Sequence, residues 1–198
     1  ILAGGGIGLS GASETLREFA EKLDAPVLTT LNGKGALRDD HPLLLGPVLM
    51  SGPVLKVLSE ADLLIAVGTR FQAFQAGVAG NQISGPLPKL IHIDIDPTEI
   101  NRVMKPDVGI VADAAEATQE LLECLPQYNS KRVPREEEMR ELKAKAAQVM
   151  EDKAGPQMAW LKAIREVLPE DGFFVDEFTQ VGYVSRVGFP VYHPRTMI

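Results

Sequence analysis

The sequence is poor in several features that would each mark a class of protein. It holds one cysteine, Cys124, in 198 residues, so no internal disulfide can form. No apolar run approaches the roughly 18 residues of a membrane-spanning helix. Basic residues are outnumbered, with 20 Lys and Arg against 27 Asp and Glu and a formal net charge of −7. This balance provides no electrostatic footprint for nucleic acid or an anionic membrane, so we expect small molecules and other subunits as partners.

The single cysteine also bears on the compartment. Cys124 lies within the apolar helical run 121–125, which favours a buried, packed side chain. An unpaired thiol of this kind fits a reducing compartment, and we expect a cytoplasmic location. With 45% apolar and 24% charged residues, the chain has the composition of an ordinary globular protein with a sizeable core.

Glycines are concentrated near the amino terminus. Gly6, Gly8 and Gly11 form the pattern G-x-G-x-x-G ahead of a helical segment, a spacing that lets a backbone turn approach a pyrophosphate. The dinucleotide fingerprint also needs a preceding strand and a carboxylate about 20 residues further on. Only three residues precede the turn, so we expect the chain to begin inside a longer protein, and no carboxylate follows the second predicted strand at 26–30. An NAD(P)-dependent dehydrogenase and a turn whose glycines only permit close packing both stay open.

Strand and helix patterns alternate over the first 126 residues. A helix is predicted at 12–23, with Ser10 as its N-cap, and a loop at 32–53. The run 62–67 is almost continuously apolar, as in a strand buried on both faces. Further elements are predicted in this order: a helix at 53–60, a glycine-rich connection at 71–86, strands at 89–95 and 108–111, a short helix after Pro97 and a helix at 114–125. The predicted fold class is α/β, a doubly wound, Rossmann-like parallel sheet.

The character of the sequence changes after Pro126. We predict a domain at 1–126, a linker with a charged helix at 127–154, and the truncated start of a second α/β unit at 155–198. Gly155 and Pro156 break the charged helix, another helix follows at 158–168, and residues 172–176 have the pattern of a first strand. Because one helix and one strand cannot bury both faces of a sheet, we expect the segment after about residue 177 to be poorly packed, rearranged or held by a neighbouring chain.

Ligands of open parallel sheets bind outside the carboxyl ends of the strands, so the residues found there are the candidate site. Glycine amides, hydroxyls, one arginine and carboxylates would suit an adenine nucleotide, but the aspartates could equally cap the following helices and pair with the arginine. No set of acid, base and nucleophile is evident, and we nominate no catalytic residue and no metal ligand. The candidate residues are Gly4, Gly5, Gly6, Thr29, Thr30, Leu31, Asn32, Gly68, Thr69, Arg70, Asp94, Asp96 and Asp113.

Three stretches in this order resemble one family. "FAEKLDAPVLTTLNGKGALRDDHPLLLG", "ADLLIAVGTRF" and "LIHIDIDPTEI" with its sequel "VGIVADAAEATQELL" are similar to the middle domain of thiamine-diphosphate-dependent enzymes of the acetolactate synthase and pyruvate decarboxylase group. The tail "GPQMAWLKAIREVLPEDGFFVDEFTQVGY" resembles the opening of the third, pyrophosphate-binding domain of the same enzymes. The resemblance implies a longer enzyme that uses thiamine diphosphate and Mg²⁺, decarboxylates a 2-oxo acid, and forms homodimers or homotetramers.

The resemblance also implies roles for individual residues. In the acetolactate synthase branch the middle domain carries FAD, and in other branches the same crevice holds ADP or nothing. Flavin-binding members continue the Arg-Phe pair with Asp-Asp-Arg, whereas this chain has Gln72-Ala73-Phe74, which favours an empty crevice and a purely structural module. The family's activating glutamate and magnesium motif lie outside these residues, so we expect the chain alone to be inactive. The matching cofactor positions are Gly4, Gly5 and Gly6 at a pyrophosphate, Thr30 and Leu31 beside it, Arg70 at a phosphate, Asp94 and Asp113 at ribose and adenine, and Thr179 and Gln180 at the thiamine diphosphate.

Overall fold

The computed structural model describes residues 1–47, 53–72, 88–129 and 133–198. Its centre is a six-stranded sheet in the order β3-β2-β1-β4-β5-β6, and every neighbouring pair is parallel. This is the strand order of doubly wound dinucleotide-binding folds, so the predicted fold class is confirmed. The strands are β1 (Leu2–Ala3), β2 (Val27–Thr29), β3 (Leu44–Pro47), β4 (Leu63–Val67), β5 (Lys89–Asp94) and β6 (Val108–Val111).

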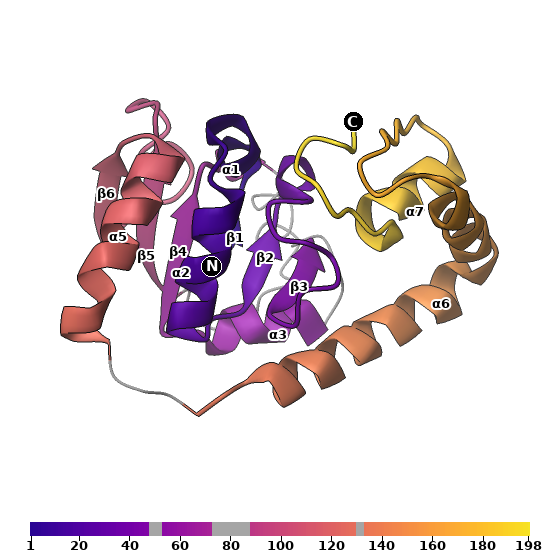
Figure 1. Cartoon of the computed structure of the whole chain (residues 1–198), viewed down its shortest axis with the longest axis horizontal. Helices are drawn as coiled ribbons and strands as arrows, with labels where there is room; N and C mark the ends of the chain where they lie inside the picture. Colours follow the sequence, from indigo (N-terminus) through magenta and orange to yellow (C-terminus); the bar gives the residue numbers. More distant parts are fainter. Residues whose placement is uncertain (48–52, 73–87, 130–132) are drawn as a thin grey trace.

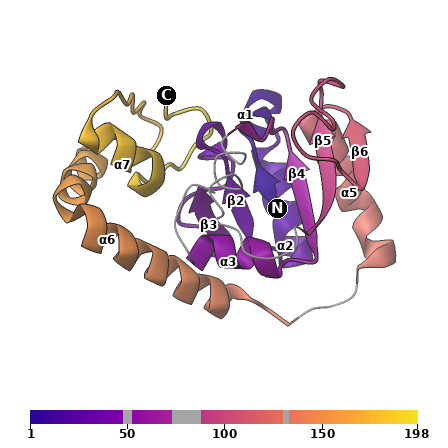
Figure 2. The same ribbon diagram turned by 180° about the vertical axis from the view of Figure 1, so that it is seen from behind.

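Helices cover both faces of this sheet (Figures 1 and 2). On one face α2 packs beside α5, and α3 on the other face contacts α6, the long helix that passes β3. Within the described ranges, no helix combines the length and apolar character that a bilayer crossing requires. The helices are α1 (Gly5–Ser10), α2 (Ser13–Leu23), the 3-10 turn η1 (Leu31–Gly33), α3 (Pro53–Glu60), α5 (Ala114–Tyr128), α6 (Glu136–Val167) and α7 (Gln180–Gly188).

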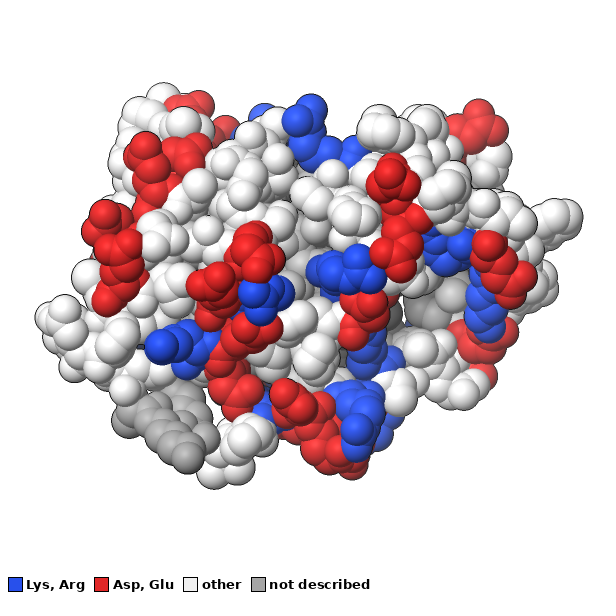
Figure 3. All heavy atoms as spheres, viewed as in Figure 1, with Lys and Arg blue, Asp and Glu red and all other residues white. Residues whose placement is uncertain are grey.

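The main core lies between the sheet and its helices. Leu2, Val27 and Ile93 come from three strands, and Ile7 and Leu16 from α1 and α2; all five side chains are almost completely buried. Burial of such aliphatic side chains contributes about 1.5–3 kcal/mol each to folding. Acidic and basic side chains are interspersed over most of the face drawn in Figure 3, whereas the area over α5, at the left, carries acidic side chains only.

Three local predictions in the first 130 residues are wrong. The predicted loop at 32–53 contains the end of η1 and the whole of β3. β3 ends in Gly46 and Pro47, two residue types that are typical of loops. Ser10 does not cap α2: it ends α1, its hydroxyl donates to the Ile7 carbonyl, and Gly11 in the left-handed region separates the two helices. Cys124 is exposed rather than buried, because it lies on the solvent side of α5.

Two further expectations also need correction. After Pro97 the chain forms consecutive turns rather than a helix, with Glu99 N–H donating to the Asp96 carbonyl at 3.1 Å. The predicted strand at 172–176 is reduced to a single parallel bridge between Phe174 and Met197. The predicted connection 71–86 lies mostly outside the described residues.

The charged helix and the helix after it are joined across a kink. Ala154 has φ −143° inside α6, directly before Gly155 and Pro156. Proline lacks a backbone N–H and its ring clashes with the preceding turn, so the helix bends where the sequence predicts a break. The helix therefore crosses the predicted boundary at 154/155, and α5 extends past the boundary at 126 to Tyr128.

The segment after residue 177 is packed, contrary to expectation. Phe189 and Val191 are nearly completely buried and form a second, smaller core with Leu161 of α6. The Phe189 ring stacks on Phe174 with centroids 4.2 Å apart. The tail thus buries its apolar side chains against α6 instead of against a sheet of its own.

This second core leads to a stability prediction. Phe189→Ala removes a buried ring and is expected to lower the free energy of unfolding by about 3–5 kcal/mol in urea titrations. The matched control is Phe178→Ala, because Phe178 is 82% exposed in the same segment, and its expected cost is below about 0.5 kcal/mol. Equal losses for the two variants would contradict the assignment of a packed tail.

Candidate functional site

The candidate site begins where the strand order reverses, between β1 and β4. Both strands end at the same edge of the sheet, and each is followed by glycine: Gly4 after β1 and Gly68 after β4. The loop after β2 lies beside them, since Thr30 N–H donates to the Ala3 carbonyl at 3.0 Å. The predicted phosphate, ribose and adenine positions are thus all at or near the strand ends on this edge.

The glycines of these loops meet backbone to backbone. A Cβ atom on Gly4 would lie 2.0 Å from the Gly68 carbonyl oxygen, and one on Gly6 would lie 2.6 Å from the Gly68 Cα. A Cβ on Gly33 would lie 2.1 Å from the Ala3 carbonyl oxygen. Each position leaves no room for a side chain, so close packing of three loops by itself requires glycine here.

Most amides of the first turn are already used. Gly4 N–H donates to the Val67 carbonyl at 2.9 Å, Gly6 N–H to the Gly68 carbonyl at 3.0 Å, and Ile7 N–H to the Gly4 carbonyl at 3.2 Å. Of the four amides from Gly4 to Ile7, that of Gly5 is the one without an acceptor among the described residues. A pyrophosphate would therefore find one available donor in this turn, fewer than the predicted cradle requires.

The hydroxyl after β2 serves the local turn. Thr30 Oγ1 accepts the Gly33 N–H at 3.1 Å and thereby caps η1, where Leu31 is half-buried. Asn32, another candidate residue, is exposed and lies directly beside Gly5, where an added Cβ would be 3.2 Å from the Asn32 Cβ.

The predicted ribose and adenine carboxylates already accept local backbone N–H groups. Asp113 accepts the Ala115 N–H at 2.8 Å and is the N-cap of α5. Asp94 is buried and accepts the Asp96 N–H at 3.0 Å, and Asp96 in turn accepts from Thr98. The described side chains include no group of three His, Cys, Asp or Glu that could hold a metal ion. The predicted helix capping is thus observed for Asp113, whereas Asp94 and Asp96 close turns because no helix follows Pro97.

Arg70 extends into solvent after β4. It is exposed and makes no ion pair with a described residue, so the predicted pairing with the aspartates does not occur there. Next to it, Phe71 is buried and packs edge-on against His92, whose Nε2 bonds to the Thr69 carbonyl at 2.9 Å. His92 is therefore a packed core histidine. Ala73 and Phe74, on which the departure from the flavin pattern depends, lie outside the described residues.

Thr179 and Gln180 are not part of this crevice. They stand at the amino end of α7, which packs against α6 and β3 away from β1 and β4 (Figure 1). Thr179 Oγ1 accepts the Gly182 N–H at 3.0 Å, and Gln180 Oε1 accepts from Gln157 of α6 at 2.9 Å. The predicted cofactor positions therefore form two separate groups.

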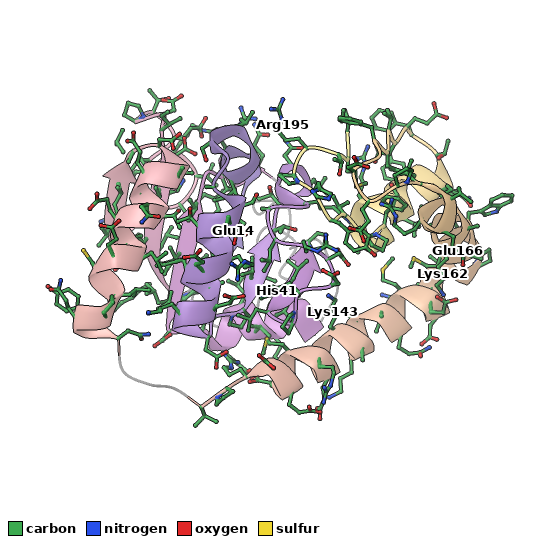
Figure 4. All side chains as sticks on the ribbon, in the orientation of Figure 1. Glu14, His41, Lys143, Lys162, Glu166 and Arg195 are labelled. Atoms are coloured by element: carbon green, nitrogen blue, oxygen red, sulfur yellow. The ribbon has the colours of Figure 1, made fainter. Side chains whose placement is uncertain are left out.

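Two basic residues near these groups were missed by sequence reasoning. Arg195, near the carboxyl terminus, lies over α1 with its side chain against Gly8 (Figure 4). Lys34, in the loop after β2, is buried. Its position between two glycines in an otherwise apolar stretch is the one local signal that could have indicated it.

Comparison with known proteins agrees with this geometry. The family described as "Thiamine pyrophosphate enzyme, central domain" matches residues 1–121. The chain belongs to this family. A probable acetolactate synthase large subunit of Methanocaldococcus jannaschii is 46% identical over 127 residues, 63% of this chain and 21% of that protein.

Two other relatives show how widely this central domain is used. A probable 2-ketoarginine decarboxylase, AruI, of Pseudomonas aeruginosa is 32% identical over all 198 residues of the chain and 34% of its own length. A glyoxylate carboligase of Escherichia coli O157:H7 is 39% identical over 126 residues, 62% of the chain and 21% of that protein. The chain thus spans between a fifth and about a third of the length of these relatives.

The crowding at the carboxyl edge can be tested with Gly4→Ala. Gly4 has φ −98°, which alanine adopts freely, so the expected loss comes from the contacts of the added Cβ with Gly68 and Thr69. Overpacking of this kind costs about 1–3 kcal/mol in urea unfolding. Gly155→Ala is the control: its Cβ would meet only Glu151 Oε1 at 3.8 Å, and a change within about 1 kcal/mol is expected. A Gly4→Ala protein as stable as wild type would refute the close approach.

Proposed function

We propose that the chain is the central part, together with the start of the cofactor-binding part, of an enzyme that uses thiamine diphosphate and Mg²⁺ to decarboxylate a 2-oxo acid. The acyl-anion equivalent would then be joined to a second carbonyl compound or released. The observation that carries this proposal is the family match over residues 1–121 together with the similarity to AruI over the whole chain. The relatives named as a synthase, a carboligase and a decarboxylase share the 2-oxo acid chemistry that we propose.

Within such an enzyme the described residues would mainly position other groups. Thiamine diphosphate supplies the electron sink for decarboxylation when it is bound. Thr179 Oγ1 already accepts one hydrogen bond, so its O–H remains available to donate to a diphosphate oxygen, and the Gln180 amide is exposed beside it. We assign no Mg²⁺ ligand and no catalytic residue to this chain.

We further propose that the crevice between β1 and β4 has a structural role and is not a flavin site. The Gly6–Gly68 hydrogen bond supports this, because it uses an amide that a pyrophosphate of FAD or ADP would need, and Asp94 and Asp113 each already accept a local backbone N–H. The domain would then only couple the neighbouring domains of the longer protein and support its assembly. An NAD(P)-dependent dehydrogenase is disfavoured for the same reason.

Turnover of the longer protein tests the main proposal. Purified enzyme supplied with thiamine diphosphate, Mg²⁺ and a panel of 2-oxo acids beginning with pyruvate should release carbon dioxide, whereas the 198-residue chain should not. Absence of turnover over the whole panel would refute the proposed activity. Turnover by the 198-residue chain would refute our view that the catalytic groups lie outside it.

Calorimetry tests the role of the crevice. Titration of the chain with FAD, ADP, NADH and NADPH is expected to give no heat of binding at micromolar concentrations. Arg70→Gln serves as the comparison, since Arg70 is the exposed cation at this edge. Micromolar binding that Arg70→Gln weakens would replace the structural role with a nucleotide site.

A further inference from the structure

The loop after β2 inserts a lysine into the carboxyl end of α7. Lys34 is 5% exposed, and its Nζ donates to the Phe189 carbonyl at 2.7 Å, with the carbonyls of Ser185 and Arg186 at 3.4 and 3.5 Å. The last carbonyls of a helix have no partner within the helix. Lys34 therefore caps α7 from a part of the chain more than 150 residues away.

The residues on either side fix this lysine in place. Gly33 fits tightly under the Ala3 carbonyl at the end of β1, as described above. Gly35 has φ +81°, and a Cβ there would lie 2.3 Å from the His193 carbonyl oxygen. Three consecutive residues thus contact, in turn, the end of β1, the end of α7 and the chain that follows α7.

Other contacts join the same two segments. Asp39 N–H donates to the Val191 carbonyl at 3.2 Å, and Arg38 pairs with Glu170 at 3.0 Å. Lys143 of α6 donates to the Asp39 carbonyl (Figure 4). These contacts are closer to the surface, whereas Lys34 is the buried polar connection between the loop and α7.

We propose that Lys34 is a positioning residue that anchors α7 to the loop after β2 and thereby fixes Thr179 and Gln180 at the other end of that helix. The part concerning the diphosphate rests on the proposed function; the anchoring itself does not. The same loop carries Thr30 and Leu31 at the crevice. It is therefore the physical link between the crevice and the amino end of α7.

The lowered pKa of Lys34 makes the detachment of α7 depend on pH. Burial lowers the pKa of Lys34 to about 8, while the nearby Asp39 carboxylate opposes that shift. The charged group that acts on it is Asp39 of its own loop, which Lys143 of α6 also faces. Arg186 of α7 offers Lys34 its backbone carbonyl, while its guanidinium pairs with Asp176. When α7 detaches, Lys34 regains water and its ordinary pKa of 10.5. Between about pH 8 and 10.5 the detached state binds more protons, so detachment becomes less favourable as pH rises.

Hydrogen exchange of the 198-residue chain tests the anchor. Lys34→Met keeps most of the volume but removes the charge and the donors, so α7 amides should lose protection about tenfold or more at pH 7. Amides of β4 and β5 should change less than about twofold, as expected for local opening. The control is Lys145→Met, because Lys145 lies exposed on α6 and pairs only with Glu141. Unchanged α7 protection in Lys34→Met would overturn the proposal.

The pH profile of the wild-type chain separates a buried amine that donates hydrogen bonds from simple packing, because burial makes the neutral form of Lys34 the one that attachment favours. After division by the intrinsic exchange rate, α7 protection relative to β4 should rise by up to about tenfold per pH unit above pH 8. This readout stands even if Lys34→Met does not fold. Lys34→Gln, which keeps a donor but does not titrate, should give a flat profile. A flat wild-type profile would overturn the role of the Lys34 amine.

The link to the cofactor is measured in the longer enzyme. Lys34→Met should raise the KM for thiamine diphosphate about tenfold and leave kcat at saturating cofactor within about twofold, since Lys34 touches no reacting group. Lys145→Met should change neither value. An unchanged KM would overturn the positioning of Thr179 and Gln180. A wild-type enzyme without turnover would instead overturn the proposed function, and hydrogen exchange would still decide the anchor.

Discussion

The fold depends on a place where three stretches of backbone touch without side chains between them. Gly4 and Gly6 lie against Gly68, and Gly33 lies against the Ala3 carbonyl. The loops that leave β1, β2 and β4 meet at this edge of the sheet, at distances that leave no room for a Cβ. The same crowding uses the amides that would otherwise face a phosphate. A dinucleotide-type glycine pattern can therefore persist in a domain where its glycines serve packing.

The alternation of strands and helices could be read from the sequence, and its failures have local physical causes. β4 and β5 were predicted because residues buried on both faces of a parallel sheet form apolar runs. β3 was missed because Gly46, with φ +107°, and Pro47 are typical of loops, and the β2–β3 register is irregular next to Val27. Cys124 was predicted to be buried because it lies in an apolar helical run, but such a run does not determine which side of α5 faces the sheet.

The candidate site was less predictable than the fold. A carboxylate after a parallel strand has the same local sequence whether it caps the next helix or holds a ribose, so Asp94 and Asp113 could not be assigned without coordinates. Lys34 was not identified because its partners are carbonyls 151 to 155 residues away, and no local spacing encodes them. The helix that begins at Gln180 was not predicted, although the Thr179 hydroxyl accepts the Gly182 N–H three residues on, as an N-cap does.

The two edges of the sheet are unequal. At one edge β3 is covered by α6 and α7, while at the other β6 pairs with β5 and, within the described residues, has no second neighbour. Val108 and Val111 of β6 are 48% and 56% exposed. A strand from another molecule could extend the sheet only at β6. Two copies joined in this way would have no further edge to offer, so association by strand addition would stop at a pair instead of growing into a fibre.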